Sequence, residues 1–355
     1  MLISCSDHHK NALDYMQNVK QIKGEWLPVN CIIGNPYSMT TMDSLLIFYD
    51  RHEGKTITVF NLNRTQCVGR FVSEGNGPGE VIAPVDVMSF SQKDELYTFQ
   101  RNTGAISTFS VPEMKMKSTV FLQNQADNLQ KMQDFFVGLG FYTKGRFGIY
   151  DMQGNLLRTE GQYPFRGETM DLIPAFITYQ GYHCASPHGN YFAIGSLFCD
   201  HLAFYEVRED ETILLKQYES RDVKAKYQDQ LLIENQCTVN YTWAYGTDAH
   251  CYLLYSGKTY EGNNQRTDGG NYLIVFDWEG NYEKTLKTDR EIRTFCVDEQ
   301  NSRIYAVALN DIGEYGIMRF SSNDSKNVLA SPDQSNDIYQ FDEIEIDGRV
   351  LPKEE

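Results

Sequence analysis

The chain has 355 residues, of which 41% are hydrophobic and 23% charged, and its 32 basic and 48 acidic side chains give a formal net charge of −16. A chain this acidic that has no basic cluster is not suited to bind nucleic acid or an anionic lipid surface. No apolar run has the length of a membrane-spanning helix. The 23 Tyr and 20 Phe residues favour strands over helices.

The first residues, Met-Leu-Ile-Ser-Cys-Ser at 1–6, resemble the end of a bacterial lipoprotein signal, in which the cysteine is acylated and becomes the mature N-terminus. We therefore expect Cys5 to carry a lipid anchor and residues 1–21 to be a signal remnant and tether. The charged region and most of the apolar region of such a signal are missing. The alternative is a chance cysteine near a terminus.

Short runs rich in β-branched and aromatic residues follow, separated by Gly, Asn and Asp, which predicts strands joined by turns. One hairpin phrase recurs as Ile-Tyr-Asp-Met-Gln-Gly-Asn at 149–155 and Ile-Val-Phe-Asp-Trp-Glu-Gly-Asn-Tyr at 274–282. With weaker echoes it returns about every 50 residues, which is typical of β-propeller blades. The runs form six groups, at residues 44–71, 85–109, 135–158, 191–215, 251–286 and 292–320.

This spacing predicts an all-β fold, a single six-bladed β-propeller over residues 22–346 with a C-terminal tail at 347–355. Seven blades are the alternative if the segment around 218–240 hides strands. We expect residues 22–33 to complete the last blade beside residues 336–346, because an open ring would leave sheet edges unpaired.

Two insertions interrupt the strand pattern. Residues 220–236 are charged and then leucine-bearing, and we expect a short helix there. Residues 256–271 are rich in Gly, Asn and Thr and predict a long mobile loop.

Three segments in the first hundred residues carry a family resemblance: Ile-Gly-Asn-Pro-Tyr-Ser-Met at 33–39, Asp-Ser-Leu-Leu-Ile at 43–47 and Gly-Asn-Gly-Pro-Gly-Glu at 75–80. Together with Cys5, they resemble the TolB-like six-bladed propeller lipoproteins of Bacteroidetes. The resemblance implies the propeller fold and a lipid-anchored location in the cell envelope, at the outer membrane, on a side that it does not determine. It carries over no catalytic residue.

The glycines at 75–79 do not form a dinucleotide loop, because a proline interrupts them and a strand rather than a helix is expected to follow. They predict a turn that needs a positive φ, and Glu80 is expected to hydrogen-bond that turn or, alternatively, to act in binding.

We expect no cofactor and no metal. The histidines are scattered without ligand spacing, and apart from Cys5 the seven cysteines have irregular spacing and no C-x-x-C, so neither a zinc site nor a disulfide framework is predicted. Asp277, Glu279 and Asn281 alternate like calcium ligands, but a tight hairpin turn already explains polar residues there.

In a propeller, the loops from the second to the third strand of each blade, and those from one blade to the next, lie on the face that most often holds the site. Their side chains mix Arg, Lys, Asp and His, which suits a ligand that bears carboxylate or hydroxyl groups. The alternative for each residue is an ordinary polar loop. The candidates are Arg51, His52, Glu80, Arg101, Lys144, Arg146, Arg166, Asp200, His201 and Asp311.

Three functions remain open. The first is a non-enzymatic, monomeric propeller that binds an envelope protein, peptide or glycan through this face. The second is a propeller enzyme of the glycosidase, lyase or lactonase type, which requires several carboxylates or histidines to converge near the axis. The third is a scaffold in an envelope complex, docked through the loop at 256–271. The fold alone does not separate them.

Overall fold

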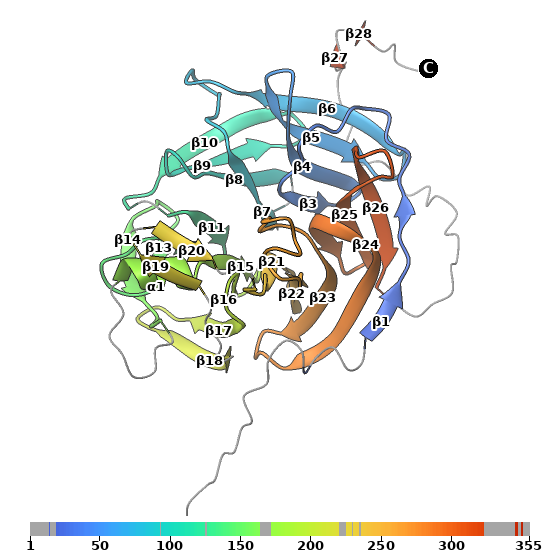
Figure 1. Cartoon of the computed structure of the whole chain (residues 1–355). Coiled ribbons are helices and arrows are strands. Elements are labelled where there is room, and N and C mark those ends of the chain that lie inside the picture. The colour runs from blue at the N-terminus through green and yellow to red at the C-terminus, as the bar shows by residue number, and fades with distance from the viewer. Residues whose placement is uncertain are drawn as a thin grey trace, which may run out of the picture.

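The computed structural model describes residues 14, 19–92, 94–124, 126–163, 172–219, 225–228, 230–233, 236–322, 345–346 and 349–350. In this part of the chain, antiparallel sheets are arranged as blades around a central axis (Figure 1). The all-β propeller predicted from the repeated hairpins is thereby confirmed.

Four separate sheets have four strands each, joined in chain order. The first contains β3 (Met39–Met42), β4 (Leu45–His52), β5 (Lys55–Asn61) and β6 (Gln66–Ser73). The second contains β7 (Val85–Gln92), β8 (Glu95–Gln100), β9 (Ala105–Ser110) and β10 (Lys115–Phe121). The third contains β11 (Asn128–Lys131), β12 (Phe136–Leu139), β13 (Phe147–Tyr150) and β14 (Leu156–Glu160). The fourth contains β15 (Gly181–Ala185), β16 (Tyr191–Ser196), β17 (His201–Val207) and β18 (Thr212–Glu219).

The remaining large sheet has eight strands and consists of two blades that share one long strand. The first half of that strand pairs with β23 and its second half with β25. In chain order after the N-terminal strands, the sheet contains β21 (Tyr241–Gly246), β22 (His250–Tyr255), β23 (Gly270–Asp277), β24 (Tyr282–Asp298), β25 (Arg303–Leu309) and β26 (Tyr315–Ser321).

The N-terminal segment closes the last blade. Strand β2 (Glu25–Trp26) pairs antiparallel with β26, and β1 (Val19–Ile22) runs parallel to the first half of β24. The expectation that residues 22–33 complete the last blade is thus confirmed. Residues 336–344 lie outside the described residues, and β27 (Glu345–Ile346) pairs with β28 (Arg349–Val350) rather than with the N-terminal segment.

The inner strands contact one another in a closed ring of six: β3, β7, β11, β15, β21, β24 and again β3. Each inner strand starts one blade when β24 is counted as the inner strand of the last. The second strand β4 is almost wholly buried, whereas the outer strand β10 has only exposed and half-buried residues. This gradient fits blades that pack face to face around the ring.

Aromatic side chains fill the space between neighbouring blades. Phe147 of the third sheet contacts Phe192 and Tyr205 of the fourth, with ring centroids 4.9 and 5.0 Å apart. Phe192 and Tyr205 stack at 4.8 Å. Such rings bury large apolar areas and prefer these edge-to-face and stacked arrangements, so they fix the angle between blades.

The repeated hairpin phrase is a structural turn. Asp277 Oδ1 accepts from the backbone N–H of Asn281 at 2.7 Å, and its Oδ2 accepts from the Asn281 side-chain amide at 2.9 Å. Asp151 and Asn155 repeat the same pair of bonds at 2.8 Å each. The carboxylate of Asp277 is therefore used within the turn, which supports the turn interpretation of this segment.

The two insertions differ in outcome. The short helix expected within 220–236 is wrong where the structure describes that segment, because β19 (Ala225–Gln228) and β20 (Gln230–Ile233) pair as a hairpin. This hairpin is a separate sheet and not a seventh blade. A short helix, α1 (Leu172–Thr178), lies instead in the connection between the third and fourth sheets. The loop expected at 256–271 is present between β22 and β23.

Candidate functional site

A cavity of about 390 Å³ opens where the inner strands β11 and β15 begin. Its lining comes from the ends of β11, β12 and β15, from loops that join second to third strands and from connections between blades. These are the two kinds of loop predicted to share one face. The lining residues are Tyr37, Arg101, Asp127, Asn128, Leu139, Gly140, Arg146, Tyr163, Phe176, Tyr179, Gln180, Gly181, Tyr182, Leu197 and Thr267.

Arg146 is the most buried charge in this lining, with only 3% of its surface exposed. It lies one residue before β13. Its Nη1 donates to His201 Nδ1 at 3.1 Å, and its Nη2 donates to Ser196 Oγ at 3.0 Å and to the Tyr179 carbonyl at 3.4 Å. The guanidinium also lies over the Tyr179 ring, 5.9 Å from its centroid. These contacts hold the side chain in one position at the cavity wall.

His201 supports Arg146 as a neutral acceptor. The imidazole is buried, and burial followed by the charge of Arg146 lowers the pKa of His201 well below its ordinary value. Because Arg146 donates to Nδ1, that nitrogen carries the lone pair and Nε2 carries the proton. His201 therefore stays neutral and does not add a second positive charge beside Arg146.

The second arginine of the cavity, Arg101, has a carboxylate partner. Its Nη2 lies 3.7 Å from Asp86 Oδ2 and 3.5 Å from the Tyr37 hydroxyl. Burial raises the pKa of Asp86 to about 6, although Arg101 opposes that rise. The pKa of Tyr37 is raised by burial and then by Asp86. This side of the cavity is an ion pair backed by a neutral phenol.

Aromatic rings from the connection that contains α1 form another wall. The rings of Tyr163 and Tyr179 lie 6.0 Å apart, and Phe176 packs edge-on against Phe141 at 5.9 Å. Burial raises the pKa of Tyr163 to about 12, so its hydroxyl stays protonated and can donate a hydrogen bond. Flat faces next to donors and acceptors are a common feature of sites for polar organic ligands.

The loop between β22 and β23 brings Thr267 to the cavity and is attached by ion pairs. Arg266 Nε lies 2.8 Å from Asp268 Oδ1, and Arg293 Nε of β24 lies 3.0 Å from Asp268 Oδ2. Lys258 pairs with Glu291 of β24. The loop is thereby tied to the neighbouring blade.

The structure brings three of the sequence-predicted residues together: Arg101 and Arg146 line the cavity, and His201 lies against Arg146. Asp200 does not line the cavity, and its Oδ1 accepts from the Tyr241 hydroxyl at 3.1 Å. Lys144 is exposed on the β12–β13 loop. Arg166 and Cys5 lie outside the described residues.

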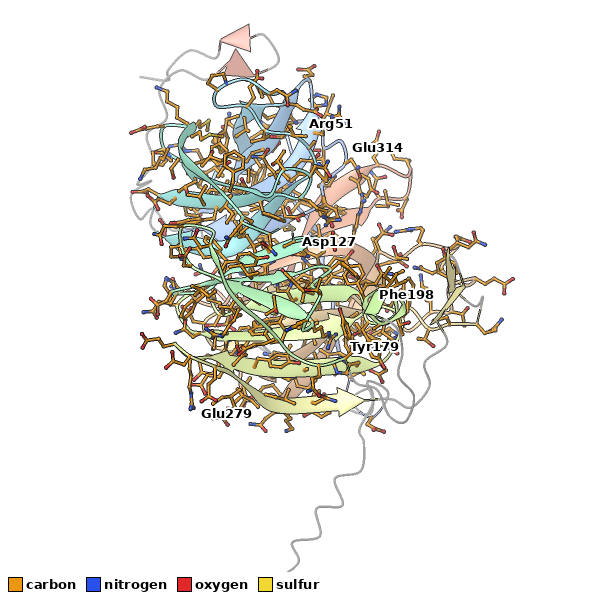
Figure 2. The ribbon with its side chains drawn as sticks, turned by 90° about the vertical axis from the view of Figure 1, so that its left-hand side faces the viewer. Arg51, Asp127, Tyr179, Phe198, Glu279 and Glu314 are labelled. Carbon is orange, nitrogen blue, oxygen red and sulfur yellow. The ribbon has the colours of Figure 1, made fainter. Side chains whose placement is uncertain are left out.

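The other predicted residues belong to local interactions outside the cavity lining. Arg51 pairs with Glu74 at 2.6 Å, and His52 lies 3.7 Å from Glu53. Asp311 is exposed and pairs with Arg290 at 2.8 Å. In Figure 2, the lining residue Tyr179 lies with Glu314 and Phe198 toward one side of the molecule and Glu279 lies toward the other, so the hairpin at 274–282 does not share the face of the cavity.

Glu80 acts within its own turn. Its Oε2 accepts from the backbone N–H of Gly77 at 2.7 Å, and a Cβ at position 75 would come within 2.1 Å of the same oxygen. Gly79 has a φ of +81°. The predicted turn with positive φ is confirmed at Gly79.

Sequence reasoning missed the aromatic lining and Asp127. One of the missed aromatic residues, Tyr37, lies in the segment 33–39 that carries the family resemblance. The resemblance singled out this segment but did not indicate that Tyr37 lines a cavity. The backbone N–H groups of Gly34 and Asn35 both donate to buried Asp50 at 2.9 Å, which fixes this segment beside the cavity.

Most of the chain also matches a family model. Residues 17–300 match the model of the TolB-like 6-blade propeller-like proteins. The chain belongs to this family. No curated protein matches the chain.

Two solved structures show the same fold as this TolB-like propeller. A Bacteroides fragilis protein described as exported has 12% identity and a TM-score of 0.50, over 88% of this chain and 96% of that one. A member of the DUF4221 family from Bacteroides vulgatus has 11% identity and a TM-score of 0.52, over 85% of this chain and 96% of that one.

The TolB-like propeller holds no activated nucleophile around Arg146 in its described part. Ser196 Oγ accepts from Arg146 and lies 3.4 Å from the Tyr179 carbonyl, so no imidazole takes its proton. Burial raises the pKa of the Cys199 thiol to about 12. Within the described ranges, no three His, Cys, Asp or Glu side chains are grouped to hold a metal, and no helix has the length and apolarity to cross a membrane.

Proposed function

We propose that this protein is a lipid-anchored propeller of the bacterial envelope that binds a glycan segment in the cavity without transforming it. The observation that carries the proposal is the cavity itself. Two arginines are held in place at its wall, by neutral partners or by an ion pair, and tyrosine and phenylalanine rings stand beside amide and hydroxyl groups. This combination fits a ligand with ring faces and many hydroxyls.

Size and chemistry favour a small polar ligand over a folded protein. A cavity of about 390 Å³ lies within the range of small-ligand sites and would hold one or two sugar units. Glycosidase chemistry uses a pair of carboxylates flanking the bond that is cut. The described lining contains one carboxylate, Asp127, while Asp86 is paired with Arg101. Binding is therefore the better-supported activity.

The envelope location rests on the TolB-like family, on the exported neighbour in Bacteroides fragilis and on the Cys5 motif. Its test is a Cys5→Ala variant expressed in the native host. We expect the wild-type protein in the membrane fraction and the variant in the soluble fraction. A variant that stays with the membrane would rule out anchoring through Cys5.

The binding function is tested with the full chain on a panel of neutral, amino and acidic glycans. The informative variant is Phe176→Ala, which removes a ring from the cavity wall. Its matched control is Phe141→Ala, which removes the neighbouring ring outside the lining. We expect glycan binding that falls in the first variant and persists in the second. Binding that is equal in both variants, or a panel without any binder, would reject the proposal.

A pull-down from the native envelope addresses the competing classes of partner. Recovery of a protein through a surface that the Phe176→Ala change does not affect would favour the scaffold function. Release of a modified sugar from any glycan of the panel would favour an enzyme.

A further inference from the structure

Arg146 is a buried cation whose charge no described side chain neutralises. Its acceptors are an imidazole nitrogen, a hydroxyl and a backbone carbonyl. The neutral hydroxyl of Tyr205 also lies close to it, and Arg146 opposes the rise that burial causes in the pKa of Tyr205. None of these groups is negatively charged. Taking a guanidinium out of water is costly unless an anion replaces the lost solvation.

The same chain treats its other enclosed arginines differently. Arg70, with 10% of its side chain exposed, lies 3.9 Å from Asp50. Arg158 lies 3.2 Å from Glu160, and Arg293 lies 3.0 Å from Asp268. Each of these has a carboxylate partner although each is less buried than Arg146. Of these four arginines, Arg146 alone lines the cavity, and it alone lacks a carboxylate partner in the described part of the chain.

The neutral hydrogen-bond partners of Arg146 leave its positive charge uncompensated. His201 cannot share the positive charge, since burial and Arg146 both hold it in the neutral form. Ser196 and the Tyr179 carbonyl fix the orientation of the planar fork without neutralising it. A guanidinium fixed in this way can offer a carboxylate its positive charge and a charge-assisted hydrogen bond from an N–H that these contacts do not use.

The other lining residues restrict which groups a ligand can carry besides a carboxylate. Asp127 has its pKa raised by burial and would repel a second anionic group at its end of the cavity. Asp127, Asn128, Gln180 and Thr267 offer acceptors and donors for hydroxyl groups. The rings of Tyr163 and Phe176 offer faces against which a sugar ring can pack.

We propose that the ligand is an acidic sugar of the uronic acid type, with its carboxylate on Arg146 and its hydroxyls toward Asp127 and Asn128. This inference rests on the proposed glycan-binding function and names the class of glycan. The carboxylate would supply the counter-charge that Arg146 lacks.

The test compares D-glucuronate with D-glucose, which differ in having a carboxylate or a hydroxymethyl group on the same ring. Calorimetric titration of the full chain at pH 7.5 should give at least about 10-fold tighter binding of glucuronate, the size expected of a charge-assisted hydrogen bond. Arg146→Gln should abolish this preference, so that glucuronate and glucose bind the variant with similar affinity. Arg146→Lys, which keeps the charge but not the fork, should retain part of it.

A measurement on the wild-type protein keeps the proposal testable should Arg146→Gln fail to fold. Glucuronate, but not glucose, should shift the ¹⁵N resonance of His201 Nδ1, because the carboxylate would sit on the guanidinium that this nitrogen accepts from. Equal shifts with the two sugars, or none with either, would overturn the inference.

The two proposals fail separately. Equal affinity for both sugars, or a preference that survives in Arg146→Gln, overturns the acidic-sugar inference. A neutral glycan that binds in the Phe176-dependent way while glucuronate does not bind overturns the inference and leaves glycan binding intact. Benzoate bound in place of glucuronate overturns the sugar class. No binding of any glycan rejects both.

Discussion

The guanidinium of Arg146 donates from Nη1 to Nδ1 of His201 at 3.1 Å, and this bond joins a loop of the third sheet to the first residue of β17 in the fourth. One contact thus sets both the position of the charge at the cavity and the tautomer of the imidazole. The pair links the packing of two blades to the chemistry of the site.

We predict that His201 remains neutral, with its proton on Nε2, at pH 5. Burial and the charge of Arg146 both lower its pKa, so protonation would place two cations side by side in the interior. Long-range ¹H–¹⁵N spectra of the imidazole should show the Nε2–H form throughout pH 5–8. Removing the neighbouring charge in Arg146→Gln should raise the pKa of His201. A charged imidazole at pH 6 in the wild type would contradict the geometry.

Substituting two glycines in turns of the same kind can separate the cost of backbone strain from the cost of steric contact. Gly154 and Gly313 share a φ of +83° and close the same kind of turn. A Cβ at Gly154 would meet the Phe121 carbonyl oxygen at 2.5 Å, whereas a Cβ at Gly313 would meet no atom of the described residues within 4 Å. We expect Gly313→Ala to lower the unfolding free energy by about 1 kcal/mol, through φ alone. Gly154→Ala should cost about 2–4 kcal/mol in urea unfolding. Equal losses would show that the contact relaxes without cost.

The blade register was predictable because it depends on local sequence. Asp, Gly and Asn recur at fixed offsets in the hairpin phrase, and in each repeat the carboxylate of Asp151 or Asp277 accepts the same hydrogen bond from the residue four positions later. The register also predicted which loops share a face. In the structure, Arg101 and Arg146 from two of these loops line the same cavity.

Distance from the axis was not predictable in the same way. Arg51 lies near the end of β4 and Arg101 directly after β8, the second strands of their blades, yet Arg51 pairs with Glu74 outside the lining and Arg101 lines the cavity. How far a loop residue reaches toward the axis depends on packing with other blades. The aromatic wall was missed for a similar reason, since Tyr163 and Tyr179 lie in a connection without strand periodicity.

The buried His183 makes stability depend on pH. Its Nε2 lies 3.0 Å from the Val137 carbonyl, and its buried Nδ1 has no hydrogen-bond partner among the described residues. Burial lowers its pKa to about 4 from 6.5. Between these values the unfolded chain binds more protons than the folded one, so stability falls as pH drops below 6.5. His183 should contribute a loss of about 2 kcal/mol at pH 5.

Urea unfolding of the wild type and His183→Gln at pH 7 and pH 5 isolates this contribution. The difference in unfolding free energy between the two proteins should shrink by about 2 kcal/mol from pH 7 to pH 5. The comparison cancels His201 and the other titrating groups that both proteins share. Parallel pH profiles would mean that His183 gains an acceptor on protonation.

Ring closure by the N-terminal segment should be worth several kcal/mol. Ile22 and Leu27 are buried in the same core cluster as β25 and β26, and the Leu27 backbone N–H donates to the Ile317 carbonyl at 2.9 Å. Leu27→Ala and Ile22→Ala should each lower the unfolding free energy by about 2–4 kcal/mol. Ile32→Ala is the matched control, because this side chain is 62% exposed and should change stability by less than about 0.5 kcal/mol. Were all three variants to unfold like the wild type, β2 would not close the last blade in solution, and the unpaired edge of β26 would be expected to promote association between copies of the chain.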